Sequence, residues 1–225
     1  MAKVIISHNS PNYVRKWEAL EEGKYNGEYY YSQDIEKYIA PELKTNRPIN
    51  TIGIKSCGGR DHMIVFAHNY LYPERYSWLL NYSDVIIVSS DSKAEKILER
   101  YGRIIHLPLS VPVDEIKKHC VKKKTQEACY YGNPWKFKQR EIAELVPPEV
   151  HRFGEMPREK AWDIIAQYKY CYAIGLCAEE AQVLGCKLKM SRYRYPDPEK
   201  AFPVLDCKDA AKMLQNELNK IDNKK

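Results

Sequence analysis

The stretch DVIIVSSDSKAEKILERYGRIIHLPL, residues 84–109, carries two short apolar runs separated by a helical pattern. Both runs are rich in β-branched residues and show little polar alternation, as strands buried on both faces do. Between them, Ser92 and Glu95 have the spacing of a capping box, and Gly102 follows the last residue of the helical pattern. A strand, a helix and a second strand in this order predict a parallel sheet covered by helices on both faces.

The same alternation of predicted strands and helices extends over most of the chain. Buried strands are predicted at residues 3–7, 50–55, 63–67, 84–89, 103–109, 127–132, 150–154, 169–176, 187–191 and 202–206, and helices at 72–82, 92–102, 134–145, 157–168, 177–184 and 207–221. The proline-flanked, charged stretch at 110–126 interrupts the pattern and is typical of a linker. We therefore expect an α/β protein of two Rossmann-like, doubly wound domains, residues 1–111 and 112–225.

The composition is that of a protein with a substantial core. The 225 residues are 44% apolar and 29% charged, with a formal net charge of +6. No run approaches the roughly 20 apolar residues of a membrane span, and the apolar run near the N-terminus is too short for a secretory signal, so we expect a cytoplasmic protein without a membrane span. The seven cysteines contain no C-x-x-C pair, which favours reduced structural thiols and no metal site.

A glycine and two lysines follow the predicted strand 127–132. In YYGNPWKFK, Gly132 and Asn133 come directly after the strand, and Lys136 and Lys138 open the next helix. Glycine lets a ligand approach the backbone, and a helix N-terminus with a nearby lysine favours an anion. The pattern predicts a diphosphate site, the alternative being an ordinary strand–helix turn. No G-x-G-x-x-G or P-loop motif is present.

Two adjacent carboxylates open the predicted helix at 177–184. Glu179 and Glu180 lie near its start, and Gly185 follows its end. Acidic residues stabilise a first helical turn and glycine supplies a left-handed C-terminal position, so capping explains both features. The second interpretation is that one of these carboxylates binds a sugar hydroxyl of a nucleotide.

Two histidines are candidate general bases. His8 follows the first predicted strand and His68 follows the strand at 63–67. A histidine with a pKa near neutrality can take a proton from an acceptor hydroxyl, whereas a histidine hydrogen-bonded in a turn is the structural alternative. Asp61 and His62, which follow a glycine-rich loop, form a weaker candidate.

Arginines and tyrosines alternate in KMSRYRYP. Strand alternation would place Arg192 and Arg194 on one face and Tyr193 and Tyr195 on the other. Such a face is suited to contacts with phosphates, bases or an acceptor, although an edge strand with outward charges gives the same pattern.

Four segments together resemble the GT-B glycosyltransferases, most closely a small and divergent member similar to glycosyltransferase families 1 and 4. They are residues 84–114, 130–138, 151–174 and 178–189, in the order seen in that family. The resemblance implies two domains facing across a cleft. The sequence departs from the family at Asn133, where arginine is usual, and at Tyr172, where retaining members carry the first acid of an E-x7-E pair.

The resemblance also implies the roles of individual residues. Gly132, Asn133, Lys136 and Lys138 would hold the donor diphosphate, Phe153 and Gly154 the base, and Glu180 the ribose.

The function implied is that of a metal-independent, hexosyltransferase-like glycosyltransferase with a nucleotide-sugar as co-substrate and no further cofactor. The positive charge, concentrated in KKHCVKKK at 117–124, makes DNA or another polyanion a conceivable partner, and modified DNA, a glycan or a protein a conceivable acceptor. The alternative is a non-catalytic, transferase-like module that binds a nucleotide or nucleic acid.

Overall fold

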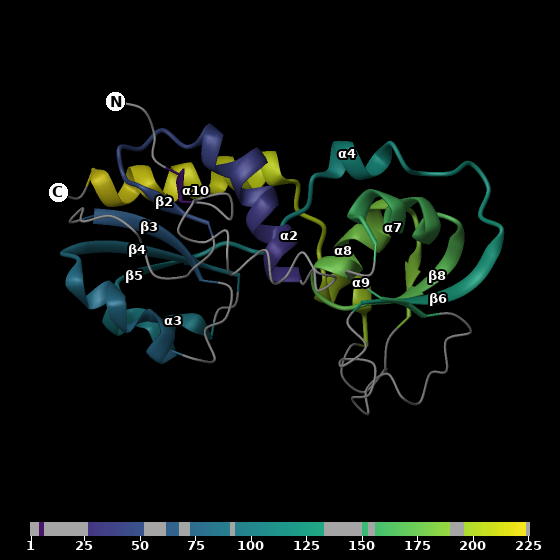
Figure 1. The fold of residues 1–225 in the computed structure, drawn as a ribbon, viewed down its shortest axis with the longest axis horizontal. Coiled ribbons are helices and arrows are strands. Elements are labelled where there is room, and N and C mark those ends of the chain that lie inside the picture. The colour runs from purple at the N-terminus through teal and green to yellow at the C-terminus, as the bar shows by residue number, and fades with distance from the viewer. Residues whose placement is uncertain are drawn as a thin grey trace. The chain divides into compact units, whose positions relative to one another are not determined.

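The computed structural model describes residues 5–6, 27–51, 62–67, 73–90, 93–132, 150–152, 156–189 and 196–223. The chain divides into two compact units (Figure 1). Among the described residues, the first unit contains Ile5, Ile6 and the described parts of Glu28–Leu109 and Cys207–Lys225, and the second contains Gly27 and the described parts of Ser110–Asp206. Each unit is built on a parallel sheet, which confirms the predicted α/β class.

The first unit has a five-stranded sheet of order β1-β2-β3-β4-β5, in which all described neighbours are parallel. Its strands are β1 (Ile5–Ile6), β2 (Ile49–Asn50), β3 (His62–Ala67), β4 (Asp84–Ser89) and β5 (Arg103–His106). Its helical elements are α2 (Gly27–Asp34), the π-helix η1 (Ile35–Ile39), the 3-10 helices η2 (Ala40–Glu42), η3 (Pro73–Asn81) and η4 (Glu99–Tyr101), and α3 (Ala94–Leu98) and α10 (Cys207–Asp222).

The two long strands of this sheet are buried on both faces. Val65 and Ile87 pack with Leu79 in a cluster that includes η3 and α3. Ile64 and Ile86, which point to the opposite face by strand alternation, are also completely buried. Figure 1 shows α10 over one face of the sheet and α3 over the other. This double covering explains the continuous apolar runs in the sequence.

Gly102 ends the helical segment for a different reason from the one predicted. Helix α3 continues as the single 3-10 turn η4, and Gly102 then adopts an extended backbone with φ 167°, not the left-handed conformation of a C-terminal cap. A Cβ atom at this position would lie 2.6 Å from the carbonyl oxygen of Val85. Glycine is needed here because the chain passes close to the backbone of β4.

The second unit has a four-stranded parallel sheet of order β7-β6-β8-β9. Its strands are β6 (Gln126–Gly132), β7 (Val150–Arg152), β8 (Tyr168–Tyr172) and β9 (Lys187–Leu188), and its helices are α4 (Val113–Lys117), α7 (Arg158–Ile165), α8 (Leu176–Val183) and α9 (Pro198–Ala201). Helix α8 ends at Val183, and Gly185 lies two residues later with φ +77°, which confirms the predicted left-handed position after the helix. The predicted helix at 134–145 lies outside the described residues.

The predicted strand at 202–206 is wrong. Its last residue, Asp206, makes an isolated bridge to Val111, and no strand forms over these residues. Pro203 has no N–H to donate to a ladder, and Val204 is 41% exposed, so this segment has neither the hydrogen bonds nor the burial of a central strand.

The sequence placed residues 207–225 in the second domain, whereas the structure groups the C-terminal helix with the first unit. Helix α10 packs against η1 and η2 and buries Ala210, Leu214 and Leu218. The apolar stripe predicted the helix correctly, but such a stripe does not specify which sheet it covers. The stretch predicted as a linker contains α4, whose Ile116 is completely buried in the second unit.

Five of the six described cysteines are buried, and no two of them form a disulfide. Cys129 and Cys171 lie opposite each other on β6 and β8, with their sulfur atoms 4.0 Å apart. They act as small apolar side chains in the sheet. Within the described ranges, none of the helices combines the length and the apolar character needed to cross a bilayer.

One lysine of the basic run is a structural residue. The Nζ of Lys124 donates to the carbonyl oxygens of Ala166 and Leu184 at 2.8 and 2.9 Å. These carbonyls lie at the C-terminal ends of α7 and α8, where unsatisfied acceptors and the helix dipole both favour a cation. Lys122 and Lys123, in contrast, are exposed.

We expect Lys124→Met to lower the free energy of unfolding by about 2 kcal/mol, because two helix ends lose a charged hydrogen-bond donor. Lys122→Met, which removes the same charge from an exposed position, is the matched control and should change stability by less than about 0.5 kcal/mol. Urea unfolding of the three proteins measures the difference. Equal stabilities of the two variants would contradict the assigned role of Lys124.

Candidate functional site

The strand order of the second unit creates a topological switch point. Strand β6 lies between β7, the next strand in sequence, and β8, the one after it. In doubly wound sheets, ligands bind outside the carboxyl ends of the strands at the point where the connections diverge to the two sides. Here that point is at the carboxyl ends of β6 and β8.

Two glycines lie at this edge of the sheet. Strand β6 ends at Gly132, which has φ +154°, and a Cβ there would lie 3.0 Å from the hydroxyl of Tyr130. Gly175 directly precedes α8 with φ +59°, and a Cβ there would meet no atom within 4 Å. Because Gly175 has no side chain, the first N–H groups of α8 receive no side-chain cap from it. The turn at Gly132 thus packs against Tyr130, and α8 begins without a side-chain cap.

Helix α8 carries two buried carboxylates beside this edge. Glu180 is completely buried, and its two oxygens have different partners. Tyr131 Oη donates to Oε2 at 2.6 Å, and Arg158 donates to Oε1 through Nε at 2.7 Å and Nη2 at 2.6 Å. Burial, followed by the charge of Glu180, raises the pKa of the Tyr131 phenol, which therefore stays a donor.

Arg158 is the first residue of α7, the helix that follows β7. Its side chain is 6% exposed, and its guanidinium carbon lies 5.0 Å from the ring centre of Trp162, one turn later. The edge thus gathers the end of β6 and the starts of α7 and α8. It combines one cation, two acidic side chains and a helix start without a side-chain cap.

Glu179 is the less satisfied of the two carboxylates. It is 3% exposed, and its Oε2 atom has no hydrogen-bond partner in the described part of the chain. Burial and the neighbouring Glu180 raise the pKa of Glu179 from 4.5 to about 8. Glu179 is therefore largely protonated at neutral pH. The structure thus buries both adjacent acidic residues.

Of the residues predicted to form a site, Gly132 and Glu180 fall in the described part, and the structure brings both to the same unit. The remaining ones lie outside the described residues: His8, His68, Asn133, Lys136, Lys138, Phe153, Gly154, Arg192 and Arg194. The weaker candidate His62 is the first residue of β3, at the amino end of that strand. This is the end opposite to the usual ligand sites of parallel sheets.

Three residues of the cluster were not predicted: Tyr131, Arg158, and Glu179 as a buried acid without a partner. Arg158 had a usable signal, because it opens a helix that follows a strand. The pairing of Arg158 with Glu180, 22 residues later, depends on the strand order and has no local pattern.

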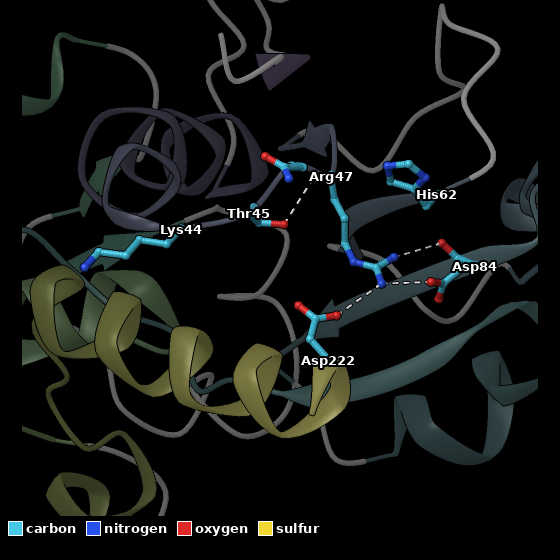
Figure 2. Close-up of a pocket in the computed structure, with 7 residues that line it drawn as sticks. Lys44, Thr45, Arg47, His62, Asp84 and Asp222 are labelled. Atoms are coloured by element: carbon cyan, nitrogen blue, oxygen red, sulfur yellow. Dashed lines mark hydrogen bonds and ion pairs between the residues drawn. The ribbon is translucent and has the colours of Figure 1, made fainter. Parts of the chain in front are cut away.

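A second polar cluster lies at the amino ends of β3 and β4 in the first unit (Figure 2). Arg47 Nη2 lies 2.8 Å from Asp84 Oδ2 and 3.5 Å from Asp222 Oδ1, at the end of α10. Figure 2 shows the Arg47 guanidinium between these two carboxylates, with His62 on the side of Asp84. The arrangement attaches the last turn of α10 to the sheet, which is a structural role.

Comparisons with family models, curated proteins and solved structures give no match to this chain. The functional interpretation therefore depends on the geometry of the carboxyl edge of the second sheet.

Proposed function

We propose that the protein is a glycosyltransferase that takes a sugar from a nucleotide-sugar donor, and that the donor binds at the carboxyl edge of the second unit's sheet. The observation that carries the proposal is the coincidence of three features at one topological switch point. These features are the glycine end of β6, the uncapped start of α8 and the carboxylates of that helix. Such edges of doubly wound sheets are where nucleotides bind.

The donor contacts follow from the chemistry of these groups. A carboxylate of α8 accepts hydrogen bonds from the ribose hydroxyls, with Glu180 as the predicted residue. The diphosphate is neutralised by Lys136 and Lys138 near Gly132, without a metal. Phe153 and Gly154 are the predicted contacts of the base. The two units would face each other across a cleft, as in GT-B enzymes, with His8 or His68 as the base that activates the acceptor hydroxyl.

One observation favours a second candidate, a nucleotide-binding module without catalysis. Tyr172 occupies the position of the first acid of the E-x7-E pair, and it packs with Ala128 and Tyr130 in the core. A phenol held in this environment does not supply the carboxylate that retaining enzymes use. Binding and turnover must therefore be measured separately.

A thermal-shift screen with nucleoside diphosphates and nucleotide-sugars tests binding. A ligand present at 100 times its Kd should stabilise the native state by about 2.7 kcal/mol. Release of the diphosphate from a nucleotide-sugar then distinguishes the enzyme from the binding module. Absence of stabilisation by every nucleotide in the screen would contradict both candidates.

We expect the double variant Lys136→Ala/Lys138→Ala to weaken nucleoside diphosphate binding by about 10-fold or more, because charged hydrogen bonds to phosphate contribute about 1.5–3 kcal/mol. Titration calorimetry measures the affinity. The double variant Lys122→Ala/Lys123→Ala removes the same charge from exposed positions of the second unit and is the control. Equal affinities of the two double variants would mean that Lys136 and Lys138 do not contact the diphosphate.

A further inference from the structure

The ion pair between Arg158 and Glu180 occupies the carboxylate that the proposed function assigns to the ribose. Oε1 of Glu180 accepts from two nitrogens of Arg158, and Oε2 accepts from Tyr131. Glu180 is fully buried and Arg158 is 6% exposed. Three of the roughly four acceptor positions of the carboxylate are thus taken, so the two vicinal hydroxyls of a ribose both reach Glu180 only when the guanidinium gives up part of its contact.

Separating this pair is costly for both members. A ligand that engages Glu180 alone takes two hydrogen bonds and a counter-charge from the buried guanidinium of Arg158, which is strongly unfavourable. Arg158 is also well placed to take an anion. It opens α7 at the carboxyl edge of the sheet, where helix N-termini favour negative charge, and a guanidinium matches phosphate oxygens in a bidentate fashion.

Building on the proposed function, we propose that Arg158 is a phosphate-binding residue of the donor site, and that its ion pair with Glu180 keeps the site closed until a nucleotide separates the two. A nucleoside diphosphate carries both replacement partners. Its vicinal hydroxyls donate to the carboxylate, and its phosphates accept from the guanidinium. A nucleoside offers only the hydroxyls. The site therefore binds phosphorylated ligands in preference to nucleosides, because only they replace both sides of the Arg158–Glu180 ion pair.

The buried Oε2 atom of Glu179 is consistent with a site that gains partners when it is occupied. It is a polar atom without a hydrogen bond in the described part of the chain, one residue from the ion pair. Buried polar atoms normally have partners, and a ligand in this region is able to supply one.

The test is titration calorimetry of the full chain with four nucleoside diphosphates (UDP, GDP, ADP and CDP) and the four matching nucleosides. The wild type should bind its preferred diphosphate about 100-fold or more tightly than the matching nucleoside. In Arg158→Met the diphosphate should lose about 30-fold or more in affinity, while the nucleoside should bind as well as before or better, because no ion pair has to open. The preference for diphosphate over nucleoside, measured as the ratio of their Kd values, should therefore fall by about 30-fold or more.

Tyr131→Phe is the matched control, since it removes one hydrogen bond from Glu180 and leaves Arg158 in place. If Arg158 served only to position Glu180, Arg158→Met and Tyr131→Phe would weaken nucleoside and diphosphate by the same factor, and the ratio would stay at its wild-type value. That result overturns the inference and leaves the proposed function standing. A wild type that binds none of these ligands overturns both. Should Arg158→Met fail to fold, Arg158→Lys keeps the charge but loses the bidentate geometry, and the same ratio is expected to fall partway.

Discussion

Replacement of Glu180 by glutamine is expected to lower the free energy of unfolding by about 3–5 kcal/mol. The substitution keeps the shape of the side chain but leaves the guanidinium of Arg158 buried without its counter-charge. Breaking a buried pair from one side is among the most destabilising single changes in a protein core. Urea unfolding at pH 7 measures the loss.

The double variant Arg158→Met/Glu180→Gln is the matched control. It removes both charges, so it should recover most of the stability lost in the single variant. Losses that simply add in the double variant would show that the two side chains act independently. That outcome would contradict the buried ion pair on which the description of the site depends.

The second large effect concerns pH. Because the pKa of Glu179 is raised from 4.5 to about 8, the folded protein keeps this proton between those values while the unfolded chain releases it. Stability should therefore fall as pH rises through this window, by up to about 1.4 kcal/mol per pH unit from this group alone. Glu179→Gln imitates the protonated acid and should remove this contribution.

The measurement is urea unfolding of both proteins from pH 5 to pH 9. The variant should gain stability relative to the wild type as pH rises, with the difference smallest near pH 5 and largest at pH 8 and above. A pH-independent difference between the two proteins would mean that Glu179 ionises in the folded state as it does in the unfolded chain.

Much of the fold was predictable because it is encoded locally. Buried strands such as β3 and β4 appear as apolar runs, and α7, α8 and α10 show helical periodicity with recognisable starts or ends. The local sequence pattern did not predict which elements far apart in the chain pack against each other. The stripe of α10 fits any apolar surface, and only the folded chain places it on the first unit. Likewise, the sequence alone does not show whether Gly102 is a left-handed helix cap or a point of close backbone approach. The carbonyl oxygen of Val85, which a Cβ atom at Gly102 would meet at 2.6 Å, favours the close approach.

The candidate site shows the same division. Gly132 and Glu180 were recognisable because each occupies a defined position at the end of a strand or the start of a helix. The environment of Glu180 was not predictable, since it depends on Tyr131 in a strand and Arg158 in another helix. The burial of Glu179 was missed for a related reason. An acidic residue in a first helical turn is ordinarily exposed, and here neighbouring elements cover it.

The central claim is that a nucleotide binds at the carboxyl edge of the second sheet. Two-dimensional amide NMR of the labelled full chain, titrated with the diphosphate that stabilises it most, tests this directly. The account predicts saturable shifts of the backbone amides of Gly132, Leu176 and Cys177, with the amides of Val65 and Ile87 in the first unit unaffected. Shifts confined to the first unit, or none at Gly132 and the start of α8 at saturating ligand, would contradict it.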